Sequence, residues 1–207
     1  KDIPSLVTKE GVFFDNHVEF VKHFLKGQIA MEDVRRELMA QAAKMERTGL
    51  PLTHVDSHQH MHMLPGVIDI SLDVAASLHL DAVRISRTPL FTAFAGMGQL
   101  IGRLGLFTLS ELSLWKAKRR HFRVPDHFEG IVAGEAVHEG HFLHILKDLR
   151  PGTTEVMMHP GTDNEKLIPA CDWEHDFEAE MQAIVSPKVR RMIADKAVKV
   201  VNYRDLK

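Results

Sequence analysis

The sequence has a single cysteine, no excess of charge of either sign and no long hydrophobic run. One cysteine, Cys171, cannot form an intramolecular disulfide or, by itself, a thiolate metal site. The 26 Lys and Arg residues nearly balance 28 Asp and Glu residues, for a net charge of −2, which argues against binding to nucleic acid through bulk charge. No apolar run of about 18 residues is available to span a bilayer, and no signal peptide opens the chain. These absences predict a cytoplasmic protein without nucleic-acid binding or membrane insertion.

Nucleotide-binding and serine-hydrolase motifs are also missing. The chain has no Gly-x-Gly-x-x-Gly, no P-loop and no Gly-x-Ser-x-Gly sequence, so these two functions lack support. What is present is a chain of 207 residues that is 44% hydrophobic and contains 14 histidines. This length and composition predict one globular domain over residues 1–207 with a buried core.

Hydrophobic spacing predicts helices and strands that alternate along the chain. Helices are expected at Asn16–Lys26, at Met31–Thr48, after Pro65, at His138–Leu149, at Trp173–Ile184 and from Ser186 to Ala197. Strands are expected at Thr53–His58, Ala82–Ser86, Phe128–Val132, Thr154–His159 and Val198–Tyr203, with a loop at Asp163–Cys171. Such alternation favours a parallel α/β sheet or barrel with its site at the carboxyl ends of the strands. A (β/α) barrel typically needs about 250 residues, so this chain is expected to lack one or two β/α units.

The strongest chemical signal is Asp56–His62 (DSHQHMH), at the end of an expected strand. Alternate residues of a strand share a face, so Asp56 and the three histidines would point the same way, about 6.6 Å apart. Two imidazoles at this spacing can converge on one metal ion, but three in a row cannot easily do so, and the strand is therefore expected to end near His58. One or two residues would be ligands, and the others would orient them or touch substrate. The alternative is a solvated His-rich loop.

Two more strand ends carry candidate site residues. His159 ends an apolar strand just before Pro160, where an imidazole with an ordinary pKa near 6.5 suits a general acid or base. Its alternative role is to cap the strand or bond to backbone. Arg84 flanks the end of Ala82–Ser86, where a guanidinium can hold a carboxylate or a sugar hydroxyl, or form an ordinary surface salt bridge.

These segments resemble a known family. The run His54–Pro65 (HVDSHQHMHMLP) resembles the signature of the YdjC-like carbohydrate deacetylases, whose best-described members remove acetyl groups from chito-oligosaccharides. Glu155–Pro160 (EVMMHP) resembles their second motif, and Arg84 stands where they carry a strand-end Arg. Pro4–Phe13 resembles the linker after their second barrel strand, and Asp126–Phe128 resembles the branch associated with hopanoid biosynthesis. The likeness covers nearly the whole chain.

The resemblance implies a distorted (β/α) TIM-like barrel that holds a divalent metal, Mg or Zn, and removes N-acetyl groups from acetylated amino sugars or oligosaccharides. It implies that His58 is a metal ligand and that His159 is the general acid. The remaining candidate residues are expected to contact substrate, at Arg84 and His62, or to support the ligands, at Asp56 and His60. The family's Asp-Asp pair and its other ligand His lie on its first two strands, which we expect to precede Lys1.

Two other functions compete with this interpretation. A metal-dependent amidohydrolase or phosphoesterase also places His-x-His at a barrel strand end, but usually on the first strand and with further ligands from later strands. A truncated, non-catalytic binding or structural protein is the second alternative. The apolar segment Pro89–Trp115 is expected to pack against the outside of the barrel or against a partner subunit, as in a homodimer.

Overall fold

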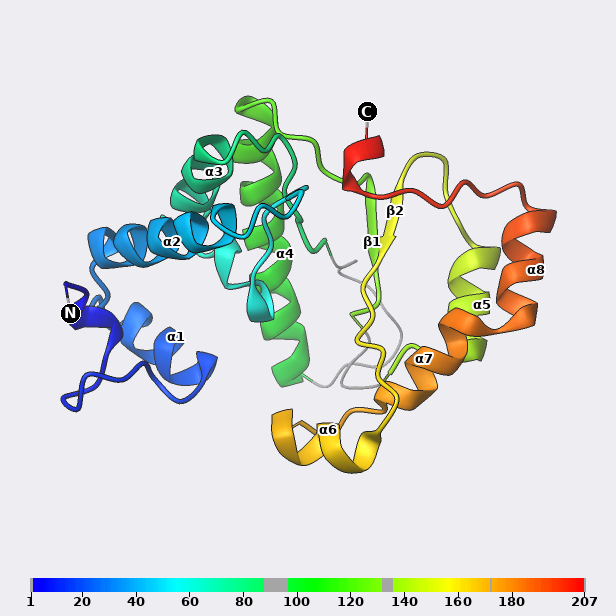
Figure 1. The fold of residues 1–207 in the computed structure, drawn as a ribbon, viewed down its shortest axis with the longest axis horizontal. Coiled ribbons are helices and arrows are strands. Elements are labelled where there is room, and N and C mark those ends of the chain that lie inside the picture. The colour runs from blue at the N-terminus through cyan, green and yellow to red at the C-terminus, as the bar shows by residue number, and fades with distance from the viewer. Residues whose placement is uncertain (1, 88–96, 132–135, 172, 207) are drawn as a thin grey trace.

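The computed structural model describes residues 2–87, 97–131, 136–171 and 173–206. Two parallel strands, β1 and β2, lie in the middle of the molecule (Figure 1). Helices α1 to α4 lie on one side of them, and α5, α7 and α8 lie on the other. The chain is therefore a mixed α/β protein in which helices outweigh strands.

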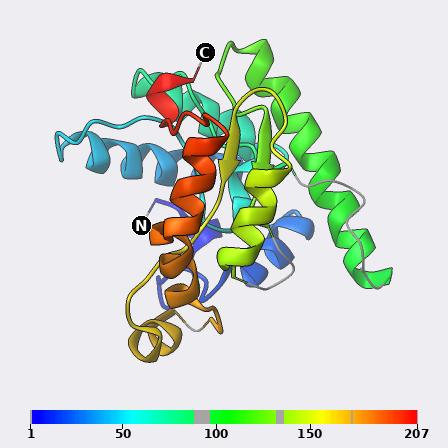
Figure 2. The ribbon, with the colours of Figure 1, turned by 90° about the vertical axis from the view of Figure 1, so that its right-hand side faces the viewer.

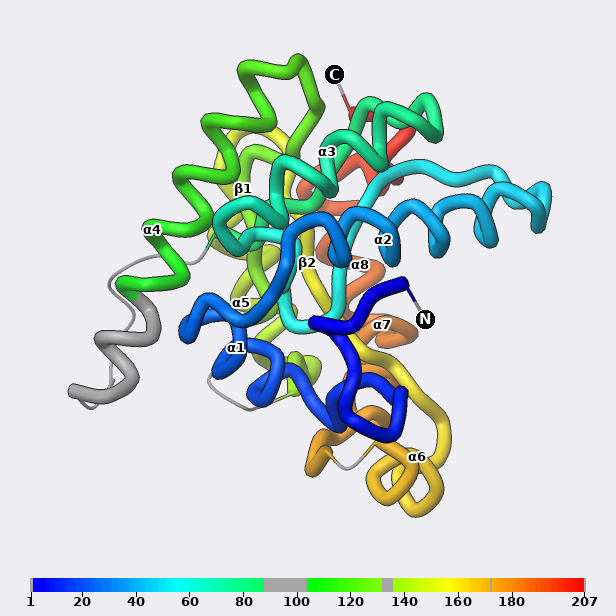
Figure 3. The backbone as a smooth tube through the Cα atoms, turned by 90° about the vertical axis from the view of Figure 1, so that its left-hand side faces the viewer, coloured from blue at the N-terminus to red at the C-terminus, as the bar shows by residue number. Residues whose placement is uncertain are grey.

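The first two helices form where the sequence predicts them. Helix α1 (His17–Leu25) is capped by Asn16, whose side chain accepts a hydrogen bond from the backbone N–H of Glu19 at 3.1 Å. Helix α2 (Met31–Glu46) follows, and a short 3₁₀ turn, η1 (Pro4–Leu6), packs against it. Figure 3 shows α2 lying beside α3, with the N-terminal segment next to it.

Helix α3 (Val67–Ser77) lies between two hydrophobic clusters and contributes apolar side chains to both, from opposite sides of the helix. One face packs toward α2, and the cluster there comprises Leu6, Ile29, Val34, Ala42, Val67, Ile70 and Val74. The other face packs toward α4 (Met97–Arg119), and the cluster there comprises Met63, Ile68, Leu72, Ala75, Val83, Ile85, Ala117 and Phe122. From Met97 onward, the apolar segment Pro89–Trp115 belongs to α4. Its residues 89–96 lie outside the described part of the chain.

The sheet is smaller than the sequence predicts. Strand β1 (His127–Glu129) pairs in parallel with β2 (Thr154–Val156), with Phe128 opposite Glu155. The strands predicted at Thr53–His58 and Ala82–Ser86 are reduced to isolated parallel bridges, Val55 with Val83 and Ala82 with Arg123. In the described residues the strands do not close into a barrel.

The C-terminal part holds helices α5 (Glu139–Lys147), α6 (Asn164–Cys171), α7 (Phe177–Val185) and α8 (Pro187–Asp195). Figure 2 shows α5 and α8 side by side on this face. Ser186 caps α8 through its hydroxyl, as predicted, and Asp176 caps α7, so that helix starts later than Trp173.

Two predictions in this part are wrong. The expected loop at Asp163–Cys171 is α6, because the Asp163 carboxylate accepts the Lys166 backbone N–H at 3.1 Å and starts the helix. The expected strand at Val198–Tyr203 pairs with no strand among the residues that the structure describes, and it ends in a 3₁₀ turn, η3 (Tyr203–Asp205). Among the helices described, none combines the length and the apolar character needed to cross a membrane.

Candidate functional site

The His-rich segment leaves extended backbone at His58. Residues His58–Met63 form a kinked 3₁₀ segment, η2, in which Gln59 and His60 have φ of 52° and 58°. This region of the backbone breaks the alternation of a strand. The extended backbone therefore ends at His58, where the sequence analysis expected it to end, although only Val55 of this segment pairs with another strand-like segment. The three histidines do not share one face.

His62 is turned into the protein interior. Its side chain is 2% exposed, its Nε2 lies 2.7 Å from the carbonyl oxygen of Arg84, and its Nδ1 lies 2.7 Å from Oγ of Ser57. Burial lowers its pKa, so the ring is neutral at pH 7. A neutral imidazole facing a carbonyl must donate from Nε2, so Nδ1 accepts from the Ser57 hydroxyl. Both ring nitrogens are thus engaged, and the predicted contact of His62 with substrate stays a prediction.

His60 points toward the strand that carries Arg84. Its Nδ1 lies 2.8 Å from Oγ of Ser86, and its ring meets Phe128 edge-on with centroids 6.1 Å apart. Burial lowers the pKa of His60 to about 4, which keeps the ring uncharged. The contact between His60 and Ser86 links η2 to the extended segment that carries Arg84. That His60 supports a metal ligand stays a prediction.

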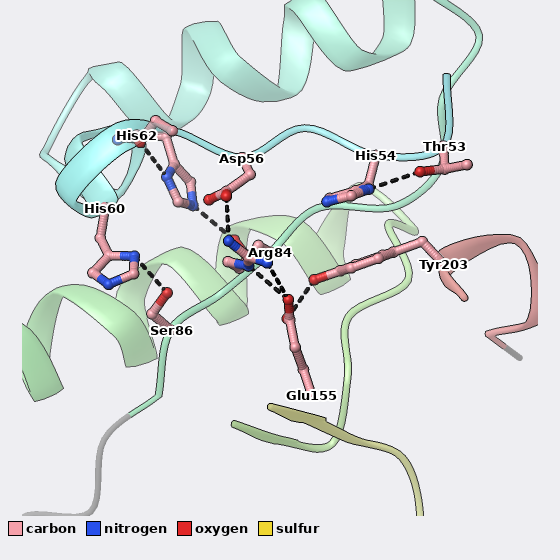
Figure 4. Close-up of polar contacts among 10 residues, drawn as sticks. Thr53, His54, Asp56, His60, His62, Arg84, Ser86, Glu155 and Tyr203 are labelled. Carbon is pink, nitrogen blue, oxygen red and sulfur yellow. Dashed lines mark hydrogen bonds and ion pairs between the residues drawn. The ribbon is translucent and has the colours of Figure 1, made fainter. Parts of the chain in front are cut away.

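Arg84 is held between two carboxylates (Figure 4). Its Nε donates to Oε1 of Glu155 at 2.7 Å, and its Nη1 pairs with the Asp56 carboxylate. The Tyr203 hydroxyl donates to the other oxygen of Glu155, and burial together with that carboxylate raises the pKa of the phenol. His54 stacks on the Tyr203 ring with centroids 3.6 Å apart. Sequence reasoning named Arg84 and Asp56 but missed Glu155 and Tyr203, which only the fold brings together.

His58 and His159 line one cavity of about 940 Å³. The residues that line the cavity come from the N-terminal segment, α1, α2, the η2 segment, and the region around α6 and α7. Its walls are rich in aromatic rings, at Phe13, Phe14, Phe20, Trp173 and Phe177. The fold therefore brings together the two residues that the sequence predicts as metal ligand and general acid.

His58 has the environment of a side chain able to bind a ligand. Its side chain is exposed to the cavity, and its ring lies edge-on to His17 with centroids 6.2 Å apart. In the described residues no hydrogen bond or ion pair occupies its ring nitrogens, so the chemistry of this group suits a metal. It does not belong to a group of three close donor residues within the described part of the chain. The described residues therefore offer His58 as one ligand of a site that needs others.

His159 lies three residues beyond the end of β2, beside the buried carboxylate of Glu180. Its backbone N–H donates to Oε2 of Glu180, while Oε1 of Glu180 accepts the Val137 N–H at 2.8 Å. Burial lowers the pKa of the His159 ring, and the negative charge of Glu180 opposes that effect. His175 lies against both, with its ring centroid 5.4 Å from that of His159. The sequence analysis assigned no role to His175 or Glu180. No local pattern marks them, because His175 precedes α7 and a separation of five residues does not place two side chains on one helical face.

Comparison with known proteins places the chain in a family. The family model described as YdjC-like protein matches residues 1–195, and the chain belongs to this family. A protein of Mus musculus named carbohydrate deacetylase is 29% identical over 98% of this chain and 71% of its own length. Proteins of the same name from Brevibacillus brevis and Homo sapiens are 24% and 28% identical, covering 100% and 98% of this chain and 72% and 68% of their own lengths. The predicted family is confirmed; the hopanoid-associated branch stays a prediction.

Proposed function

We propose that this protein is a hydrolase that removes N-acetyl groups from acetylated amino sugars or oligosaccharides. The observation that carries the proposal is the meeting of His58 and His159, from separate segments, on the wall of one cavity. The names of the related proteins support a carbohydrate deacetylase. The aromatic rings in the cavity suit the apolar faces of sugar rings, and the polar side chains among them can bond to sugar hydroxyls.

A divalent metal, Mg or Zn, is part of this proposal, with His58 as the ligand that this chain contributes from the cavity. Such an ion, when bound, polarises a carbonyl group and makes water more acidic. Asp56 and Arg84 lie behind η2 and are paired with each other, so they hold the backbone that presents His58. Arg84 is also proposed to contact substrate. For that contact its guanidinium must present an N–H group that is not bonded to the carboxylates of Asp56 and Glu155.

His159 is proposed to move the proton that amide cleavage requires. Its lowered pKa makes the ring neutral at pH 7, so it can take a proton from the attacking water. The oxygen of that water forms a bond to the acetamide carbon. When the C–N bond then breaks, the same proton goes to the departing amine nitrogen, which leaves poorly as an anion. The products are acetate and the free amino sugar.

The order of the parallel segments supports a barrel as the finer fold. Val55 pairs with Val83, Ala82 pairs with Arg123, and β1 pairs with β2. Strand-like segments that follow one another in the sequence are thus paired side by side, and the strand order does not reverse. This is the strand order of a (β/α) barrel and not that of a doubly wound sheet. We propose that these segments are an arc of a distorted barrel, and an experimental structure of the full-length protein with a closed ring of strands would test this.

The activity is tested by measuring acetate release from N-acetylglucosamine oligomers with the full-length protein. We expect His159→Ala to keep the metal ion held at His58 and to lose about 10²- to 10⁴-fold in kcat/KM, the usual contribution of a positioned acid–base group. We expect His58→Ala to lose metal as measured by elemental analysis. His144→Ala is the matched control, because His144 lies exposed on α5 away from the cavity.

Other results would favour the competing functions. Release of phosphate from simple esters without release of acetate would indicate a phosphoesterase. Binding of acetylated oligosaccharides without hydrolysis of either substrate would indicate a non-catalytic binding protein. If His58→Ala keeps full metal content, the assignment of His58 as a ligand is wrong.

A further inference from the structure

Three potential metal ligands meet behind the cavity wall. One donor atom each from His159, His175 and Glu180 lies within 4.8 Å of the others. His175 and Glu180 are only 5% and 1% exposed, whereas His159 is partly open to the cavity. The cluster therefore has two buried donors and one donor that faces the cavity.

The imidazole of His175 is buried with both nitrogens unsatisfied. Neither Nδ1 nor Nε2 makes a hydrogen bond, although Nε2 lies 3.3 Å from Oε1 of Glu180. Leaving a buried polar group without a partner costs about 1–3 kcal/mol, so native proteins rarely do so. A ligand between these atoms would remove that cost.

The spacing of these atoms matches zinc. Bonds of about 2.0–2.1 Å to His nitrogen and carboxylate oxygen in a tetrahedron put neighbouring ligand atoms roughly 3.3–3.4 Å apart. The distance from Nε2 of His175 to Oε1 of Glu180 is already 3.3 Å. The third donor, on the half-buried His159 ring, lies within 4.8 Å of the other two. Two imidazoles and one carboxylate favour zinc over magnesium, which prefers oxygen ligands.

The surroundings hold the two buried ligands in place. The carboxylate of Glu180 is fixed by the backbone N–H groups of Val137 and His159. Trp173 stacks on the His175 ring with centroids 4.1 Å apart, and Phe177 packs against the same ring with centroids 4.9 Å apart. Groups that orient ligands in this way are a regular part of metal sites.

We propose that His159, His175 and Glu180 form a zinc site separate from the ion at His58. A zinc ion there uses the ring nitrogen lone pair of His159 that proton transfer requires, so zinc at this site inhibits the enzyme. The inhibition rests on the proposed function, whereas the binding does not.

Zinc binding is tested first, without an activity measurement. The full-length protein, freed of metal by a chelator, is titrated with Zn²⁺ alone and followed by equilibrium dialysis with elemental analysis. We expect His175→Gln and His159→Ala each to weaken one zinc equivalent by at least about tenfold, which is 1.4 kcal/mol. We expect His58→Ala and the exposed control His144→Ala to keep that equivalent. Co²⁺ in its place should give the visible absorption of a tetrahedral ion in the wild type and not in His175→Gln.

Circular dichroism separates loss of the site from loss of the fold. His159→Ala removes a partly exposed ring and leaves the buried pair of His175 and Glu180 in place, so it tests the site even if His175→Gln fails to fold. Wild-type zinc binding by a folded His159→Ala or His175→Gln variant would overturn the proposal. So would loss of all zinc binding in His58→Ala.

Inhibition is tested second. Excess Zn²⁺ should reduce acetate release by the wild type, a chelator should restore it, and His175→Gln should need at least about tenfold more zinc for the same reduction. Equal zinc sensitivity of both proteins would overturn the inhibitory role. If the protein releases no acetate at all, the proposed function fails, while the dialysis experiment still decides whether the zinc site exists.

Discussion

At the scale of single residues, Gly130 leaves the least room for a side chain among the described glycines. It follows β1 with φ of +101°, a conformation that side chains rarely adopt. A Cβ atom at this position would lie 2.2 Å from the carbonyl oxygen of Met157 and 2.9 Å from its nitrogen. Both contacts are with backbone, which cannot move aside without breaking the pairing next to His159.

We expect Gly130→Ala to lower the free energy of unfolding by at least about 2 kcal/mol, since strain in φ and a backbone clash act together. Gly27→Ala is the matched control, because Gly27 also has a positive φ, of 69°, but nothing lies within 4 Å of the added Cβ. We expect the control to lose about 1 kcal/mol from strain alone. Urea denaturation of both variants measures the difference; equal losses would show that the close approach to Met157 does not matter.

At the scale of elements, Asp33 joins the N-terminal turn to α2. Its carboxylate accepts the backbone N–H of Ser5 at 2.8 Å and the Ser5 hydroxyl at 2.7 Å. These two hydrogen bonds hold the pKa of Asp33 below its ordinary value of 3.8. The contact keeps η1 against α2, on the side of the cavity lined by the N-terminal segment.

The contact between Asp33 and Ser5 is expected to make the folded state less stable at acid pH. Because the folded-state pKa is lowered, the stabilisation is fully present above the unfolded value near 3.8 and is lost as the pH falls through the folded value. We expect Asp33→Asn to unfold at a lower temperature than the wild type at neutral pH, and the gap to close below pH 3.8. Thermal unfolding across this range measures it.

The control for Asp33 is an exposed acid on the same helix. Glu32 pairs with Arg36 at 3.5 Å with 62% of its side chain exposed, so Glu32→Gln should change the unfolding temperature little. A gap for Asp33→Asn that stays constant down to acid pH would contradict the role of the charged carboxylate.

Helices that begin with a recognisable side-chain cap could be predicted from the sequence, whereas strands, which depend on a distant partner, could not. Helices α1 and α8 have side-chain caps at Asn16 and Ser186, and both form where predicted. A strand exists only through a partner elsewhere in the chain, so apolar runs such as Val198–Tyr203 give no reliable sign of pairing. The sequence does not predict helix α6, because an Asp such as Asp163 is as typical of a turn as of a helix N-cap.

At the scale of the whole molecule, the network around Arg84 ties together segments that are far apart in sequence. Asp56, Arg84, Glu155 and Tyr203 come from four separate segments (Figure 4). The side chains of Arg84 and Glu155 are 19% and 11% exposed. Removing one partner of a largely buried ion pair leaves a charge without compensation.

We expect Arg84→Met to lower the free energy of unfolding by about 3 kcal/mol, because Glu155 and Asp56 lose their cation together. Arg150→Met is the control, since Arg150 is 60% exposed and lies 3.9 Å from Glu129; it should cost less than about 1 kcal/mol. Chemical denaturation decides between them. A similar small loss for both variants would mean that the Arg84 network contributes little to the fold.

The sequence by itself determined the family and the alternation of helices with strand-like segments, and it marked His58 and His159 as candidates, because these depend on local spacing and on motifs of consecutive residues. The tertiary structure decided that both face one cavity, that His62 and Arg84 are engaged within the protein, and that His175 and Glu180 lie beside His159. These facts depend on contacts between distant segments, and a pattern along the chain does not specify which distant side chains burial will bring together.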